Sequence, residues 1–202
     1  MSDRGALTRE KRISKAGSQT SARIFTYLVC LSFLLLSCSG TPSEVRPAFY
    51  HWKSRFAPSA MELAYLDSLE VGRLYLRFFD LDWDEGRREI VPVGKLRIDA
   101  QPPVGMEIIP TLFITNRSIL ELEPNSVSSL ASQILELTDR IARQVPAHTW
   151  REMQIDCDWS GQSRDRYFQL LEAIGKELAK SGKRLSVTLR LHQYRYPRTT
   201  GV

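Results

Sequence analysis

Two segments of the chain repeat apolar residues at the three- and four-residue steps of an amphipathic α-helix. The first segment carries Val127, Leu130, Ile134, Leu137, Ile141 and Val145. The second carries Tyr167, Leu170, Leu171, Ile174 and Leu178. Gly182 follows the second segment in the position of a helix C-cap. A third helix is predicted from Ser59 to about Leu69, because Ser59-Ala-Met-Glu62 has the sequence of a capping box.

Five shorter apolar or aromatic runs predict β-strands. They cover residues 48–52, 73–79, 107–114, 152–159 and 184–191. Residues 88–98 show no helical period, and we expect a small hairpin there around Pro92 and Gly94. Strands that alternate with helices in this way predict βαβ units and a parallel sheet.

The order of these elements predicts an α/β protein with an incomplete parallel (β/α) barrel, holding about five of the eight strands. An open doubly wound sheet fits less well, because no Gly-rich phosphate loop follows any strand. The barrel domain is expected over residues 48–202. We expect this part to be poorly stable alone, since its first strand would lack the eighth strand as a neighbour.

The first 37 residues have the pattern of a secretion signal. Six basic residues come first, and the apolar run 24–36 that follows is too short to span a bilayer comfortably. The run ends in Leu35-Leu36-Ser37-Cys38, which resembles the bacterial lipobox. This resemblance implies removal of residues 1–37 and a lipid anchor on Cys38. The small, polar and proline-containing residues that follow predict a flexible tether over 38–47. An ordinary signal or an uncleaved anchor that happens to contain a cysteine is the alternative.

Removing the signal changes the charge balance of the protein. The whole chain has 28 Lys and Arg against 23 Asp and Glu, and residues 1–37 hold six and two of them. The remaining 22 basic and 21 acidic residues nearly cancel, so the composition does not favour nucleic-acid binding. Cys157 would be the only free thiol left, and no intrachain disulfide is expected.

Polar and aromatic residues gather where the predicted strands end. In parallel βα folds the ligand lies at the carboxyl ends of the strands. The residues expected there are Tyr50, His51, Trp52, Asp80, Asp82, Trp83, Thr115, Asn116, Asp156, Asp158, Trp159, Arg190, His192 and Gln193. Carboxylates accept hydrogen bonds from sugar hydroxyls and aromatic rings stack on sugar C–H faces, so this set predicts a carbohydrate site. The spacing of the histidines does not favour a metal site, and no cofactor is expected.

Asp156-Cys157-Asp158 is the sharpest candidate for catalysis. Side chains two residues apart on a strand share one face, so both carboxylates would project to the same side. Two carboxylates close together favour a general acid or a proton-sharing pair. The alternative is structural: one aspartate caps the following helix while the other pairs with Arg190.

Two segments carry a resemblance to a known family. Gln154-Ile-Asp-Cys-Asp-Trp159 and Leu189-Arg-Leu-His-Gln193 are similar to an uncharacterised family of bacterial lipoproteins with a glycoside-hydrolase-like barrel. Asp156-x-Asp158 also resembles the D-x-D-x-E motif of chitinase-like glycosidases, but Ser160 stands where that motif has its catalytic Glu. The resemblance implies a barrel and brings no established activity.

Two functions therefore remain open. The first is a carbohydrate-active barrel in the cell envelope, with Asp156 and Asp158 as the acid–base or stabilising pair. The second is a non-catalytic surface lipoprotein that binds a glycan or a protein partner through the same aromatic residues. Ser39, which follows Cys38, favours sorting to the outer membrane in either case.

Overall fold

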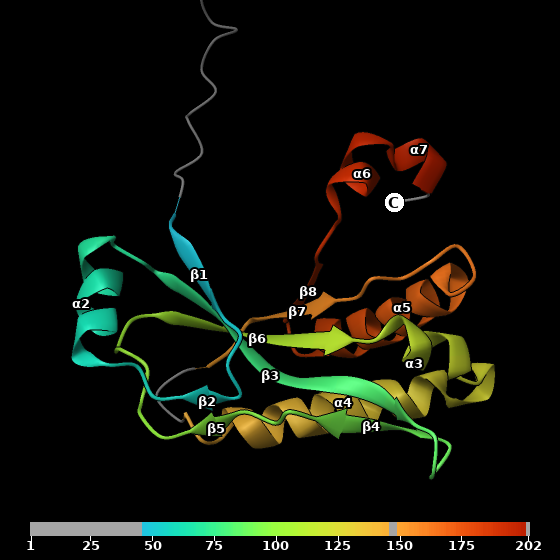
Figure 1. Cartoon of the computed structure of the whole chain (residues 1–202), viewed down its shortest axis with the longest axis horizontal. Coiled ribbons are helices and arrows are strands. Elements are labelled where there is room, and N and C mark those ends of the chain that lie inside the picture. Colours follow the sequence, from blue (N-terminus) through green and yellow to red (C-terminus); the bar gives the residue numbers. More distant parts are fainter. Residues whose placement is uncertain (1–45, 146–148, 201–202) are drawn as a thin grey trace, which may run out of the picture. The chain divides into compact units, whose positions relative to one another are not determined.

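A mostly parallel sheet of six strands is the frame of the fold (Figure 1). The computed structural model describes residues 46–145 and 149–200 of the 202-residue chain. The strands of this sheet are β1 (Ala48–His51), β3 (Arg73–Asp84), β4 (Glu89–Val93), β6 (Glu107–Ile114), β7 (Glu152–Asp156) and β8 (Arg184–Val187). A separate two-stranded parallel sheet consists of β2 (Arg55–Phe56) and β5 (Arg97–Ile98). The predicted signal, Cys38 and the tether up to residue 45 lie outside the described residues.

The strand order follows the chain without reversal. Five strands lie in the order β1-β3-β6-β7-β8, each parallel to its neighbour, and β4 pairs antiparallel with β3. The α/β class and the parallel sheet are therefore confirmed. β1 and β8 do not pair with each other within the described residues, so the sheet is not a closed barrel.

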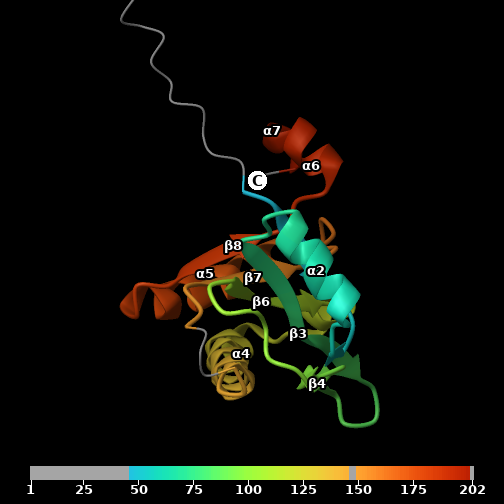
Figure 2. The same cartoon turned by 90° about the vertical axis from the view of Figure 1, so that its left-hand side faces the viewer.

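Helices precede β3 and separate β6 from β7 and β7 from β8, as predicted, whereas β3, β4, β5 and β6 follow one another without a helix. The helices are α2 (Ala60–Ser68), α3 (Asn116–Glu121), the 3-10 turn η1 (Pro124–Ser126), α4 (Val127–Ala142), α5 (Arg164–Lys180), α6 (Leu191–Arg195) and α7 (Pro197–Thr200). The expected capping box begins α2, since Ser59 Oγ accepts from the Glu62 N–H and the Glu62 side chain accepts from the Ser59 N–H. Figure 2 shows α4 and α5 next to each other beside the sheet. Among the described helices, none combines the length and the apolar composition of a membrane-spanning segment.

The sheet has one apolar face and one polar face. The apolar face packs in the core with α4 and α5, and its buried members include Leu74, Leu76, Leu81, Leu112, Ile114 and Ile155. The residues that alternate with them along each strand point to the other face of the sheet. We call this second set the polar sheet face, and its members are Tyr50, Tyr75, Arg77, Asp80, Thr111, Gln154, Asp156 and Ser186.

A β-bulge in β3 shifts the alternation of this strand by one residue relative to β6. Arg77 is opposite Thr111 and Phe79 is opposite Leu112, so Phe78 is the extra residue. Both Phe78 and Phe79 are buried as a result. Asp80 follows on the polar sheet face, opposite Phe113.

Several element ends differ from the predictions. The hairpin forms between β3 and β4, and its turn lies at Glu85–Arg88. The predicted turn around Pro92 is wrong, because Pro92 lies inside β4. Proline has no backbone N–H, and β4 tolerates it because this strand is at the edge of the sheet and pairs with β3 alone. β7 and β8 end earlier than predicted, at Asp156 and Val187, because the chain leaves the sheet at both points. The six-residue α3 has no strong apolar period and was not predicted.

Leu112 provides a test of the core. It lies in β6 with no exposed surface, so Leu112→Ala leaves a cavity and should lower the free energy of unfolding by about 2–5 kcal/mol. Val104 is 94 % exposed, and Val104→Ala should change it by less than about 0.5 kcal/mol. Urea denaturation followed by circular dichroism measures both values, and equal losses would contradict the placement of β6 in the core.

Candidate functional site

The polar sheet face is concave. Tyr50 Oη donates a hydrogen bond to Gln154 Oε1 at 2.8 Å. β3 and β6 lie between the strands that carry these residues, and in a flat sheet three spacings of about 4.8 Å would hold their backbones about 14 Å apart. Both side chains lean across the face to meet, and we infer that the sheet curves around this face.

Three aromatic rings stack at one side of this face. The ring of Tyr50 lies 4.6 Å from that of Tyr75 and 5.4 Å from that of Trp52, and the Trp52 ring is within 5° of parallel to it. Trp52 therefore belongs to the polar sheet face, although it follows the end of β1. Trp52 and Tyr50 are each 44 % exposed, and Tyr75 is partly buried. Tyr50 stacks on two rings and Trp52 on one, so Trp52 is the exposed ring with more room for a ligand to stack.

Two carboxylates of β3 are held at its carboxyl end by different partners. Asp80 forms an ion pair with Arg77, whose Nε donates to Asp80 Oδ1 at 2.6 Å. Asp82 Oδ1 accepts from Thr115 Oγ1 at 3.0 Å and from the Trp83 N–H at 2.9 Å. Both carboxylates are partly exposed, so each keeps capacity to accept further hydrogen bonds.

The predicted pair Asp156 and Asp158 differs in setting. Asp156 is the last residue of β7, is partly buried and accepts a hydrogen bond from Thr188 Oγ1. Asp158 lies beyond the strand and is exposed. Burial still alternates beyond the end of the strand, because Cys157 and Trp159 are buried while Asp156 and Asp158 keep exposed surface. Cys157 between them is buried, as alternation predicts.

Four other predicted ligand residues are arranged differently from the expectation. His51 alternates onto the apolar face, opposite Leu76, and does not join Tyr50. Trp159 is buried, and its ring packs against Tyr167 and Phe168, so it belongs to the core and offers no stacking surface.

Arg190 and His192 lie past the end of β8. Arg190 is the N-cap residue of α6, and its Nη2 donates to the Trp159 carbonyl at 2.5 Å. Within the described residues it forms no ion pair with Asp156 or Asp158, so the structural alternative for that pair lacks its proposed contact. His192 is exposed on α6.

The amino-terminal half of the polar sheet face has paired charges. Arg73 Nη2 lies 2.8 Å from Glu107 Oε2, and Arg184 Nη2 lies 3.1 Å from Glu152 Oε2. The partners of each pair come from neighbouring strands, so these residues join strands across the sheet. The carboxylates that accept from hydroxyls instead lie at the carboxyl ends.

Asn116 joins the loops that follow β6 and β7. Its Oδ1 accepts from Ser163 Oγ at 2.5 Å and from the Ser160 N–H at 3.2 Å. Ser160 stands where the chitinase-like motif has its catalytic Glu, and here it contributes to a loop contact. Position 160 therefore holds no carboxylic acid that could take the role of that Glu.

Sequence reasoning missed several residues of this face: Tyr75, Arg77, Gln154 and Thr188. Strand alternation could have found Gln154, which precedes Asp156 by two residues, and Tyr75, which lies within the predicted strand 73–79. Within the described ranges, no group of three or more His, Cys, Asp or Glu side chains is arranged to hold a metal ion.

The chain matches no known protein family, and no curated protein or solved structure matches it either. The similarity to lipoproteins with a glycoside-hydrolase-like barrel stays a prediction from the two segments that carry it.

Cys157 gives a test of the packing beneath this site. Burial, with a further contribution from Asp156 and Asp158, raises the pKa of its thiol from 9.0 to about 12. The folded protein therefore keeps this proton at pH values where the unfolded chain loses it. The resulting stabilisation is complete below about pH 9 and is lost as the pH rises toward 12.

We expect the unfolding free energy of the wild type to fall by about 1 kcal/mol more between pH 8 and pH 10 than that of Cys157→Ala. Urea denaturation at the two pH values gives both differences. The comparison concerns the pH slope only, because the substitution also leaves a small cavity. Identical slopes would show that the thiol is accessible to water.

Proposed function

We propose that this chain is an exported, lipid-anchored protein whose polar sheet face binds carbohydrate. The observation that carries the proposal is the exposed ring of Trp52, stacked on Tyr50 at the edge of a concave face that also bears Asp80 and Asp156. Apolar C–H faces of a sugar pack on such a ring, while its hydroxyls donate to carboxylates.

A (β/α) barrel is part of the proposal. Strands that follow the chain order without reversal, a polar concave face, and α4 and α5 packed on the other face are the features of the strands and helices in such a barrel. In that fold the polar sheet face is the barrel interior, and its carboxyl end is the ligand side. This orientation favours Asp80, Asp82 and Asp156 as ligand contacts over the paired charges at the amino end.

Binding without turnover is the better supported version. Retaining and inverting glycosidases both need two carboxyl groups that flank the bond to be cleaved. Asp156 and Asp158 remain the candidates, but they differ in setting, and Asp156 already accepts a hydrogen bond from Thr188. Chromatography of an oligosaccharide incubated with the protein distinguishes the two versions, since an enzyme releases shorter products.

The amino-terminal sequence supports the anchor. A basic segment, the apolar run 24–36 and the sequence Leu35-Leu36-Ser37-Cys38 suit export followed by acylation of the cysteine. An acyl chain on Cys38 would hold the sheet domain at the outer face of a membrane through the following tether. The proposed location is the cell envelope, with the outer membrane favoured by Ser39.

Trp52→Ala tests the carbohydrate proposal. We expect the substitution to weaken oligosaccharide binding at least about tenfold, because the ring supplies the stacking surface. Isothermal titration against neutral gluco-, galacto- and N-acetylglucosamine oligosaccharides measures the change. The melting temperature should stay near that of the wild type, since Trp52 is 44 % exposed.

Tyr194→Ala is the matched control. Tyr194 is an aromatic residue of α6, 76 % exposed and outside the polar sheet face, so its removal should leave binding unchanged. The proposal is wrong if the wild type binds none of these sugars, or if both variants lose binding equally.

The anchor is tested by metabolic labelling. Cells that express the full chain are grown with a fatty-acid analogue, and the label should appear on the wild type and disappear from Cys38→Ala. The reason is that Cys38 provides the thiol to which lipid is attached. Cys157→Ala serves as the control and should be labelled like the wild type. Equal labelling of Cys38→Ala would rule out this anchor.

A further inference from the structure

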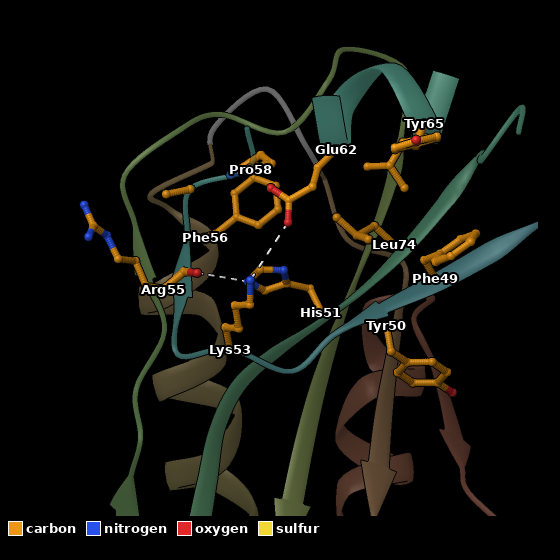
Figure 3. A pocket seen from close by; sticks show the side chains of 12 residues that line it. Phe49, Tyr50, His51, Lys53, Arg55, Phe56, Pro58, Glu62, Tyr65 and Leu74 are labelled. Carbon is orange, nitrogen blue, oxygen red and sulfur yellow. Dashed lines mark hydrogen bonds and ion pairs between the residues drawn. The ribbon is translucent and has the colours of Figure 1, made fainter. Parts of the chain in front are cut away.

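A separate cavity lies on the other face of the sheet, between α2, β1 and β2 (Figure 3). Its volume is about 230 Å³, somewhat below the range of about 300–1,000 Å³ that holds drug-sized ligands. The walls are largely apolar: Phe49, Phe56, Tyr65, Leu66 and Leu74. A space of this size and lining suits one aromatic ring or a short aliphatic body.

Glu62 places a carboxylate at the mouth of this cavity, where its side chain is 54 % exposed. Its Oε2 accepts from the Ser59 N–H at 2.7 Å and from Ser59 Oγ at 2.9 Å, and these hydrogen bonds hold the pKa of the Glu62 carboxyl below its usual value. The carboxylate is therefore anionic at neutral pH. Among the residues that the structure describes, its other oxygen, Oε1, has only a distant partner, Lys53 Nζ at 3.9 Å. Figure 3 shows the carboxylate pointing from α2 toward His51.

His51 adds a second acceptor. Its Nε2 lies 3.0 Å from the Arg55 carbonyl oxygen, so in the neutral ring Nε2 carries the proton and Nδ1 is an acceptor. The ring is fixed by an edge contact with Phe56, with centroids 5.1 Å apart. Nδ1 faces the same space as the Glu62 carboxylate in Figure 3.

The cations near the cavity do not make it a site for anions. Arg55 points away from it, as Figure 3 shows, and forms an ion pair with Asp99. The Lys53 side chain is 77 % exposed, and its pair with Glu62 is long, so it can move into water at little cost. The fixed groups are thus one carboxylate, one imidazole acceptor and aromatic rings, which together favour a cation.

We propose that this cavity binds a small primary amine with an aromatic body. The ring lies among Phe56, Leu66 and Leu74, and the ammonium group donates to Glu62 Oε1 and His51 Nδ1 in place of Lys53. Lys53 acts as an internal competitor that closes the mouth when no ligand is bound. This site is on the opposite face from the carbohydrate site and does not depend on it.

The test uses three probes with the same ring and different charge: 2-phenylethylamine, 2-phenylethanol and phenylacetate. Their binding to the full chain is followed by NMR or isothermal titration. We expect the amine to bind at least about tenfold more tightly than the other two, because only the amine gains the charge-assisted hydrogen bond. Equal affinities, a preference for phenylacetate, or no binding of the amine would overturn the proposal.

Two variants locate the ammonium group. Glu62→Gln keeps the capping box, in which Gln can replace Glu, and should weaken amine binding about tenfold with little loss of stability. Lys53→Met removes the competing cation and should tighten amine binding several-fold. Lys95→Met makes the same change in net charge at an exposed loop residue outside the cavity, and it should leave the affinity unchanged. An amine that binds Glu62→Gln as well as the wild type, or binds Lys53→Met less tightly, would also overturn the proposal.

Discussion

The curvature of the parallel sheet is the constraint on which the other features depend. Helices pack on the apolar face, which becomes convex, and the polar side chains of the opposite face are thereby brought toward one another. Tyr50 and Gln154 show the extent of this approach, since they bond across two intervening strands. Charged residues could not lie so close on that face without partners, and ion pairs such as Arg73 with Glu107 link neighbouring strands there.

The same alternation gives the two sides of the sheet different chemistry. Residues of β1 that follow each other in sequence, Tyr50 and His51, turn toward opposite faces of the sheet, although Tyr50 also borders the cavity. On one side a ring stack and partly exposed carboxylates suit a ligand with many hydroxyls. On the other side a small apolar cavity under α2 holds a single anionic group, Glu62. A ligand that suits one side lacks the groups that the other side requires.

Long periodic elements could be predicted from the sequence, whereas the ends of strands could not. Helices α4 and α5, strand β6 and the capping box of α2 agree with their predictions, because many residues contribute to each pattern. β7 ends at Asp156, and beyond it Trp159 packs against Tyr167 and Phe168 of α5, a contact between residues that local period does not describe. The site prediction shares this weakness, since Asp158, Arg190 and His192 were placed by assuming longer strands. His51 was misplaced for a different reason: the alternation of β1 was not applied to it.

The bulge at Phe78 has a consequence for how such a strand is interpreted. Before it, residues with even numbers (Leu74 and Leu76) face the helices, and after it residues with odd numbers (Phe79 and Leu81) do so. A strict period of two carried through β3 would put Asp80 in the core and Phe79 among the polar groups. The strand therefore contains a change of phase, encoded by two adjacent phenylalanines. The extra residue of the bulge is what places the Asp80 carboxylate on the polar sheet face, so the number of residues before Asp80 matters as much as their identity.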